Sequence, residues 1–249
     1  MLPKQLKPKF NYKLIRIGSH SDGGYLIENN SFLNSDFLIA GGINDNWEFE
    51  KQFKKPFIAI DDRLSITYLI QRLIINFLKI LLLKKQYFIK SIKNIFDYTL
   101  NKIFFLNGYI SNYDDKSKGY ITLKTIIDKY YSKKSSNSIF LKLDIEGSEY
   151  RVLNDIITLQ NYFSGIVIEF HDIDLHLDKI LKFIEKLDMS LVHIHPNNYG
   201  GVDKNSNPKV VEITFSKYPK IISNRVRLPN ILDKPNGKGI QDLELKFKK

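Results

Sequence analysis

The stretch that decides the fold is IFLKLDIEGSEYRVL, residues 139–153. An apolar run typical of a buried strand ends at Leu143, and a helical pattern begins soon after Gly147. Asp144 and Glu146 therefore lie where a strand ends, and open α/β sheets bind ligands at the carboxyl ends of their strands. The alternative is that both carboxylates only cap the following helix.

The chain on both sides repeats this alternation of strand and helix. Apolar runs predict five buried strands, at 37–40, 57–60, 103–106, 139–143 and 165–169. Helical patterns follow at 47–53, 123–131, 148–159 and 175–187. Two more strands, 189–195 and 210–215, have no helix between them. The pattern predicts the α/β class, with a mainly parallel sheet and an antiparallel strand at its edge.

The composition is that of a folded domain. The chain has 249 residues, of which 43% are apolar, and this is enough for a large core. It has no cysteine, which excludes disulfides, thiolate zinc sites and cysteine nucleophiles. We expect a substrate-side segment at 1–35, a main domain at 36–216 with a helical insertion at 64–102, and a basic tail at 217–249.

The positive charge is concentrated in two segments. The net charge of +11 suggests nucleic acid or an anionic membrane as a partner. Segments 64–102 and 217–249 each carry a net charge of +6, however, so the rest of the chain sums to about −1. The region around Asp144 is therefore not basic, and we expect no nucleic-acid partner.

The insertion at 64–102 is apolar on nearly all sides. Its longest uninterrupted apolar run, residues 80–83, has four residues, and a transmembrane helix needs about 20. We expect its helices to pack over the sheet or in an interface between copies of the chain. Contact of the lysines in 84–93 with a membrane surface is the alternative. The N-terminus lacks the apolar region of a secretory signal, so the expected location is cytoplasmic, at the inner face of the membrane if this contact exists.

Two features indicate a nucleotide-type cofactor. Gly41 and Gly42 follow the first strand, where a ligand meets backbone amides. Asp61 and Asp62 end the next strand about 20 residues on, the position at which an acidic residue accepts hydrogen bonds from ribose hydroxyls. A solvent-exposed pair of carboxylates at a strand end is the alternative.

Histidine and carboxylate side chains gather at later strand ends. Glu169 and His171 share a face at the carboxyl end of the fifth strand, and His195 ends the following one. A histidine beside a carboxylate can act as a general base near neutral pH. Alternatively, Asp144, Glu169 and His171 could hold a divalent ion such as Mg²⁺ or Mn²⁺.

Polar loops supply candidates for substrate binding. Residues 16–25 are rich in polar side chains and glycine, and a hairpin turn explains their Asp-Gly-Gly sequence. Asp22 and Tyr25 in this segment are candidate substrate contacts, as are Asn197 and Asn198 in the loop after His195.

Four stretches together resemble a known family: LKLDIEGSEYRVL, IVIEFH, the His-x-His-Pro-Asn-Asn loop and VVEITF. They are similar to the FkbM-type family of S-adenosylmethionine-dependent O-methyltransferases, over residues 36–216 apart from 64–102. The resemblance implies the Rossmann-like class I methyltransferase fold, a mostly parallel seven-stranded sheet with one antiparallel strand near its edge. Many members of that family methylate sugar hydroxyls during antibiotic or surface-polysaccharide biosynthesis.

The resemblance also implies roles for individual residues. Gly41 and Gly42 would approach the methionine part of S-adenosylmethionine, Asp61 its ribose, and Asp144 its sulfonium, with Glu146 beside them. Some sugar O-methyltransferases of similar fold bind magnesium where Glu169 and His171 lie. One departure concerns the first loop, residues 40–45, which reads Ala-Gly-Gly-Ile-Asn-Asp instead of Gly-x-Gly-x-Gly.

The expected function is transfer of a methyl group to a hydroxyl of a sugar or sugar-linked intermediate. A bacterial surface polysaccharide, in a capsule or lipooligosaccharide, is the expected setting. His195 or His171 would serve as base, and Asp144 and Glu169 would orient it or bind a metal ion. The alternative from another class is a non-catalytic, membrane-associated assembly subunit. An NAD-dependent dehydrogenase is disfavoured because the chain lacks the Gly-rich fingerprint.

Overall fold

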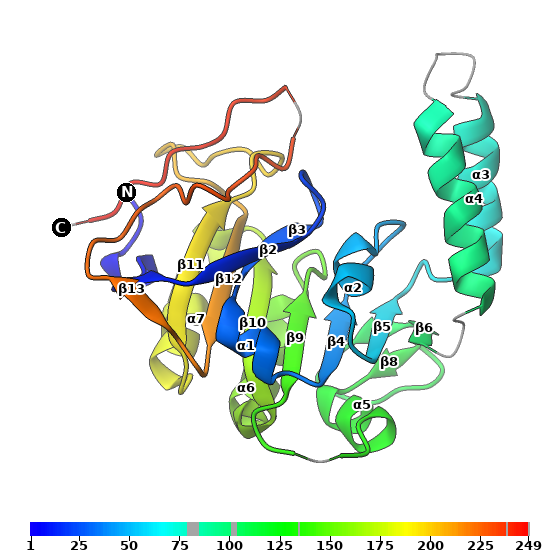
Figure 1. The fold of residues 1–249 in the computed structure, drawn as a ribbon, viewed down its shortest axis with the longest axis horizontal. Coiled ribbons are helices and arrows are strands. Elements are labelled where there is room, and N and C mark those ends of the chain that lie inside the picture. The colour runs from blue at the N-terminus through cyan, green and yellow to red at the C-terminus, as the bar shows by residue number, and fades with distance from the viewer. Residues whose placement is uncertain (79–84, 101–103, 134, 238, 249) are drawn as a thin grey trace.

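The computed structural model describes the chain except for residues 79–84, 101–103, 134, 238 and 249. At its centre lies a seven-stranded sheet (Figure 1). Its strands are, in chain order, β4 (Phe37–Gly41), β5 (Phe57–Asp61), β6 (Phe105–Asn107), β9 (Ile139–Leu143), β10 (Phe163–Phe170), β11 (Ser190–Pro196) and β12 (Val211–Ser216). They follow the spatial order β11-β12-β10-β9-β4-β5-β6. The first residue of the predicted strand 103–106 lies outside the described residues.

The strands from β6 across to β10 run parallel, as the sequence predicts. β12 is antiparallel to both of its neighbours, β10 and β11. The antiparallel strand therefore lies second from the edge. This corrects the prediction of an antiparallel edge strand by one position and confirms the antiparallel strand near the edge that the family resemblance implies. All six residues of β12 are buried, which suits a strand that has a neighbour on each side.

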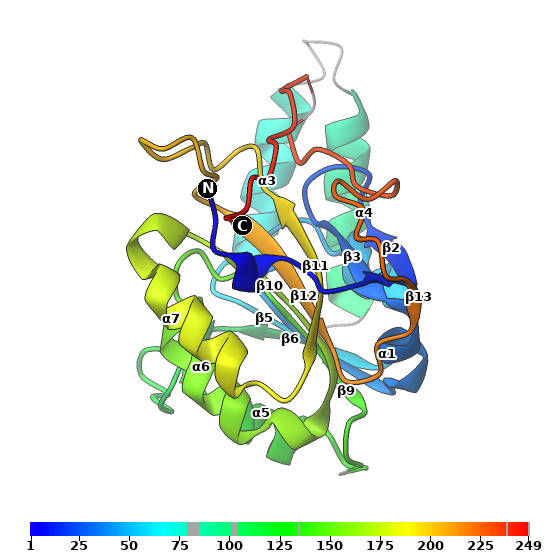
Figure 2. The same cartoon turned by 90° about the vertical axis from the view of Figure 1, so that its left-hand side faces the viewer.

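One face of the sheet is covered by α5 (Leu123–Tyr130), α6 (Glu149–Thr158) and α7 (Ile173–Lys186) (Figure 2). Their apolar stripes bury Ile126, Val152 and Ile180 completely against the sheet. The hydroxyl of Thr122 accepts a hydrogen bond from the Thr125 amide at 3.1 Å, which confirms the predicted N-cap of α5.

The opposite face is covered by α1 (Asn29–Asn34), α2 (Glu48–Phe53) and a hairpin of β2 (Leu14–Gly18) and β3 (Gly24–Glu28). The hairpin confirms the turn predicted at Asp-Gly-Gly. Tyr25 of β3 packs edge-on against Phe49, and Phe49 and Phe53 contact Phe140 of the sheet. Through α2, these contacts join the hairpin to the sheet, and the main chain of β3 lies against β10, β11 and β12.

Short elements complete the described part of the chain. They are η1 (Lys4–Leu6), β1 (Asn11–Tyr12), β7 (Tyr109–Ile110), β8 (Tyr120–Ile121), η4 (Gln160–Tyr162) and β13 (Ile221–Ser223). β1 pairs with β13, and Leu2 forms a bridge with Phe247. The segment expected as a basic tail thus packs back against the N-terminal segment and the sheet.

The described part of the insertion is a helical hairpin, α3 (Ile66–Leu78) and α4 (Lys85–Leu100). It extends away from the β5 and β6 side of the body (Figure 1). In the described part of the chain, no helix is long and apolar enough to span a bilayer.

Candidate functional site

A cavity of about 380 Å³ lies at the carboxyl ends of β4, β5 and β9. This volume is within the range of small-molecule sites, roughly 300–1,000 Å³. Of the residues predicted to bind a cofactor, Gly42, Asp61, Asp144 and Glu146 line it. Gly41 is buried at the end of β4 and does not line it.

The loop after β4 packs directly on the loop after β9. Gly42 has a φ of 72°, and a Cβ atom there would lie 1.5 Å from the carbonyl oxygen of Asp144. The Asp144 amide donates to the Gly41 carbonyl at 3.0 Å. Only glycine fits this conformation and this close approach, so the Gly-Gly pair fixes how the two loops meet.

Asp61 supports the same loop from β5. Its Oδ2 accepts the amides of Ile43 and Asn44 at 2.9 and 2.7 Å, and its Oδ1 accepts the amide of Arg63 at 2.8 Å. An ionised carboxylate offers about four lone-pair sites, so one remains for a ligand in the cavity. The neighbouring Asp62 is exposed, lines the cavity, and accepts the Tyr109 hydroxyl at 3.0 Å.

Side chains of the helical hairpin hold this loop in place. The guanidinium of Arg72 donates twice to Oδ2 of Asp45, at 2.8 and 2.5 Å. Tyr68 donates to Asn44 Oδ1 at 2.5 Å, and Asn94 donates to the Asp45 carbonyl at 2.8 Å. The loop that departs from Gly-x-Gly-x-Gly therefore obtains its conformation from contacts with α3 and α4.

Lys142, in the middle of β9, is buried under the cavity. Its Nζ donates to the Gly42 carbonyl at 3.0 Å and lies 3.4 Å from Oε1 of Glu50, a side chain buried in α2. The ammonium group also lies over the ring of Tyr25. One buried cation thus connects the sheet, α2 and the loop after β4 that contains Gly42, which we call the Gly42 loop.

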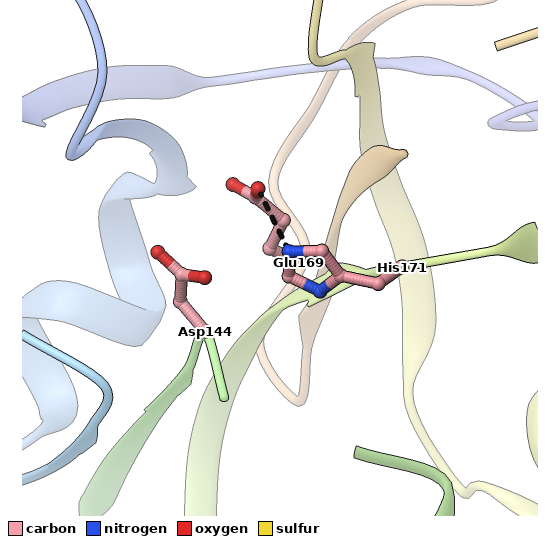
Figure 3. A group of neighbouring side chains, drawn as sticks. All are labelled: Asp144, Glu169 and His171. Atoms are coloured by element: carbon pink, nitrogen blue, oxygen red, sulfur yellow. Dashed lines mark ion pairs between the residues drawn. The ribbon is translucent and has the colours of Figure 1, made fainter. Parts of the chain in front are cut away.

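Asp144, Glu169 and His171 come together at the ends of β9 and β10 (Figure 3). Each offers one possible ligand atom, and these atoms lie within 4.8 Å of one another. Nε2 of His171 is 3.6 Å from Oε1 of Glu169. We call these three residues the carboxylate–histidine cluster; they are the same three that the sequence suggested for a metal ion.

Glu149, which the sequence reading did not single out, orients His171. It is the first residue of α6 and is fully buried. Its Oε1 accepts the amides of Ile145 and Gly147, at 3.0 and 3.2 Å, and lies 3.1 Å from Nδ1 of His171. With Nδ1 engaged by Glu149, Nε2 faces the cluster. Metal-bound histidines are typically oriented by a carboxylate in this way.

Burial and neighbouring charges shift the pKa values of all three residues of the cluster. Burial raises the pKa of Asp144 to about 6, although the charges of Lys142 and His171 and the hydrogen bond from Tyr25 counteract it. Burial and then the charge of Asp144 raise the pKa of Glu169 well above its usual range. Burial lowers the pKa of His171, but Glu149 and the nearby carboxylates raise it above its ordinary value.

Only one of the two carboxylate oxygens of Glu169 has a hydrogen-bond partner. Its Oε1 accepts a hydrogen bond from the side-chain amide of Asn197 at 2.8 Å, while its Oε2 is buried without a partner. A buried carboxylate oxygen without a donor is costly, and a cation beside it would remove this cost. The donor set of two carboxylates and one imidazole fits a divalent cation.

His195 lies in another polar group, beneath the C-terminal segment. Its Nε2 is 3.1 Å from Oδ2 of Asp242, and its Nδ1 is 3.6 Å from Oε2 of Glu212. Burial lowers its pKa, but the two carboxylates raise it to about 10. At neutral pH the ring is therefore protonated with both nitrogens facing carboxylates. This arrangement leaves no ring nitrogen to take a proton from a substrate.

The remaining predicted residues divide between cavity and interior. Asp22 lines the cavity, and Glu146, which also lines it, is exposed in a turn with a positive φ of 54° and has its Oε2 3.4 Å from Nε2 of His171. Tyr25 is buried and donates to Oδ2 of Asp144 at 2.9 Å. Asn197 binds Glu169, and Asn198 accepts the Gly237 amide at 2.7 Å, so both act inside the protein.

Part of the chain matches a known protein family. Residues 85–191 match the family described as "Methyltransferase FkbM domain". A search of curated proteins gave no match. One similar solved structure is that of "a putative methyltransferase from Thermoplasma acidophilum", which is 12% identical, with 76% of this chain and 69% of that chain covered and a TM-score of 0.31. A TM-score this low supports no conclusion about the fold, which is assigned from the strand order described above.

The matched residues run from α4 to β11 and include β9 and β10. The chain thus matches the FkbM methyltransferase domain over the part that holds Asp144, Glu169 and His171, and the resemblance found in its sequence is confirmed there.

Proposed function

We propose that the protein is an S-adenosylmethionine-dependent O-methyltransferase that acts on a hydroxyl of a sugar or sugar-linked intermediate. The observation that carries this proposal is the position of Asp144. It lines the cavity at the strand ends and also belongs to the carboxylate–histidine cluster. A donor in the cavity and an acceptor at the cluster would therefore meet at one carboxylate. The match to the FkbM methyltransferase domain supports the same assignment.

The residues around the cavity suit a nucleoside donor. Asp61 and Asp62 line the cavity, and the lone pair of Asp61 that accepts no backbone amide would be available to a ribose hydroxyl. Gly42 lines the cavity beside Asp144, where the methionine part would lie. When bound, S-adenosylmethionine supplies a methyl group on positively charged sulfur, so the acceptor oxygen gains a C–O bond while the C–S bond breaks.

The work left to the protein is alignment of the acceptor and removal of its proton. Alignment alone can contribute about 7–11 kcal/mol. Asp144 has a pKa of about 6, so its carboxylate is ionised at pH 7 and is placed to accept the hydroxyl proton. A general base typically contributes a factor of about 10²–10⁴. The buried hydroxyl of Tyr25 fixes the orientation of this carboxylate.

The cluster also fits a divalent cation such as Mg²⁺ or Mn²⁺. Asp144, Glu169 and His171 would hold the cation. It would also compensate the buried Oε2 of Glu169, which has no hydrogen-bond partner. Such a cation lowers the pKa of a hydroxyl bound to it. Release of the acceptor proton would then require only a weak base.

A sugar acceptor in surface-polysaccharide biosynthesis is proposed from the family resemblance. The polar cavity rim, with Asp22, Asn44 and Asn46, offers hydrogen-bonding partners for sugar hydroxyls. This chemistry is compatible with a nucleotide sugar or a glycan chain of a capsule or lipooligosaccharide.

The test is methyl transfer from S-adenosylmethionine labelled in its methyl group to a panel of nucleotide sugars and glycans. We expect a labelled product with the wild type and at least a 100-fold lower rate with Asp144→Asn. Leu175→Glu, at a position 73% exposed on α7, serves as the control variant. Transfer that proceeds equally in Asp144→Asn would refute the role of Asp144, and failure to bind the donor would refute the enzyme assignment. Loss of activity in chelator, restored by Mg²⁺ or Mn²⁺, would support the cation.

A further inference from the structure

Three polar side chains of the α3–α4 hairpin are buried, whereas many of its large apolar side chains are exposed. Asn76, Ser91 and Asn94 are 3%, 5% and 7% exposed. Asn76 donates to the Ser91 hydroxyl across the hairpin at 2.7 Å, and Asn94 donates to the Asp45 carbonyl. Helices that pack on a protein core normally bury apolar stripes instead.

The outward side chains form a stripe on each helix. Ile70, Ile74 and Phe77 of α3 are 45%, 58% and 56% exposed, and Ile89, Ile92 and Phe96 of α4 are 54%, 49% and 62% exposed. Spacings of three and four residues place each set on one side of its helix. Exposed apolar surface of this kind marks an interaction site, because burial of these side chains against a partner would remove them from water.

Lysines accompany the stripe of α4. Lys85 lies four residues before Ile89, and Lys93 lies four residues after it, so both side chains lie along the same side of the helix. Both are exposed. Elsewhere on the hairpin, Arg72 is paired with Asp45, and Asp97 is paired with Lys51 of the body. The charge that the stripe presents is therefore positive.

We propose that the α3–α4 hairpin docks on an anionic lipid surface. Lysines beside an apolar stripe suit a lipid interface, because their stems lie along apolar surface while their charges reach the headgroups. Near an anionic bilayer each lysine contributes about 1 kcal/mol. A second copy seated on the same stripe would instead bring Lys85 and Lys93 against like charges, which is unfavourable. The hairpin extends away from the body, so the sheet does not obstruct this contact (Figure 1).

The proposal does not depend on methyl transfer, and its test is binding of the full chain to vesicles. Phosphatidylcholine vesicles with and without phosphatidylglycerol are sedimented with the protein. We expect strong binding only to the anionic vesicles, weakened by salt. Ile92→Glu/Phe96→Glu should bind at least tenfold more weakly, while Leu175→Glu binds like the wild type.

A second pair of variants distinguishes the contribution of the hairpin lysines to vesicle binding from that of the overall positive charge of the chain. Lys85→Glu/Lys93→Glu should weaken vesicle binding by at least about fivefold per lysine, or about 25-fold in total, because each substitution removes a positive charge and adds a negative one. Lys4→Glu/Lys9→Glu changes the same charge at exposed positions near the N-terminus and should have little effect. Thermal melting checks that each variant is folded.

Two results would overturn the proposal. One is equal vesicle binding by the wild type and both hairpin variants. The other is a dimer in light scattering that the Ile92→Glu/Phe96→Glu substitutions abolish, with no binding of the wild type to anionic vesicles. That second result would assign the stripe to a second copy of the chain.

Discussion

Replacing Lys142 by Met removes the buried cation that joins β9, α2 and the Gly42 loop. The ammonium group is the ion-pair partner of Glu50, at 3.4 Å, and a donor to the Gly42 carbonyl, at 3.0 Å. Glu50 is 1% exposed, and neither of its carboxylate oxygens has a hydrogen-bond partner. Lys142→Met therefore leaves the charge of Glu50 uncompensated in the interior and leaves the Gly42 carbonyl, in the loop after β4, without its donor.

The expected loss of stability is large. Breaking a buried ion pair by removing one partner costs about 3–5 kcal/mol. The lost hydrogen bond to the Gly42 carbonyl adds about 1 kcal/mol. For a chain of this size, 1 kcal/mol shifts Tm by about 2–4 °C, so a total loss of about 4–6 kcal/mol should lower Tm by roughly 8–24 °C. Replacing both partners by apolar residues is often nearly neutral, so Lys142→Met/Glu50→Met should recover most of the loss.

The assay is urea unfolding followed by circular dichroism, arranged as a double-mutant cycle over Lys142 and Glu50. Calorimetric titration with S-adenosylmethionine on the same variants reports the state of the Gly42 loop. The double variant should regain stability but bind the donor more weakly than the wild type, because the contact with the Gly42 carbonyl is still absent. A loss below 1 kcal/mol in Lys142→Met, or additive losses in the double variant, would refute this reasoning.

Three further predictions concern the loop after β4, the carboxylate–histidine cluster and the C-terminal segment. Arg72→Ala removes the ion pair that holds Asp45 and should weaken S-adenosylmethionine binding about fivefold in calorimetry; unchanged affinity would mean that the hairpin does not support the loop. Glu169→Gln should weaken Mn²⁺ binding more than tenfold in electron paramagnetic resonance titrations, and equal affinity would place the ion elsewhere. The pKa of His195 is about 10, above its unfolded value of about 6.5, so its stabilisation is complete below pH 6.5 and is lost as pH rises through 10. Urea unfolding of the wild type should show this decline and His195→Gln should not; parallel pH profiles would contradict it.

Much of the sheet could be predicted because its strands are short apolar runs that end in Gly, Asp or Asn. The run at 139–143 coincides with β9, and 210–215 differs from β12 by one residue at each end. The place of β12 between β10 and β11 could not be predicted, because strand order is set by contacts between distant segments. The same limit explains why the segment at 217–249 was expected as a tail although it packs on the body.

The site was predictable where it follows from topology alone. Asp144 and Glu169 end adjacent parallel strands, so their side chains had to meet at one edge of the sheet. The role of Glu149 was not visible, because a carboxylate in the first turn of a helix usually reads as a capping residue. The partner of His195 is Asp242, 47 residues away in irregular chain, and no sequence pattern indicates that contact.

The hairpin shows a third kind of limit. The sequence indicates helices that are apolar on nearly all sides, but it does not indicate which side faces the body. Asn76 and Asn94 face inward, where they have hydrogen-bond partners, and most of the isoleucines, such as Ile74 and Ile89, face outward.

The central claim is that the cavity at the ends of β4, β5 and β9 binds S-adenosylmethionine. Calorimetric titration of the full chain with S-adenosylmethionine, S-adenosylhomocysteine and NAD⁺ tests it most directly. We predict saturable binding of one molecule of either adenosyl compound per chain and no binding of NAD⁺. Absence of binding by both adenosyl compounds, or saturable binding of NAD⁺ alone, would contradict the account.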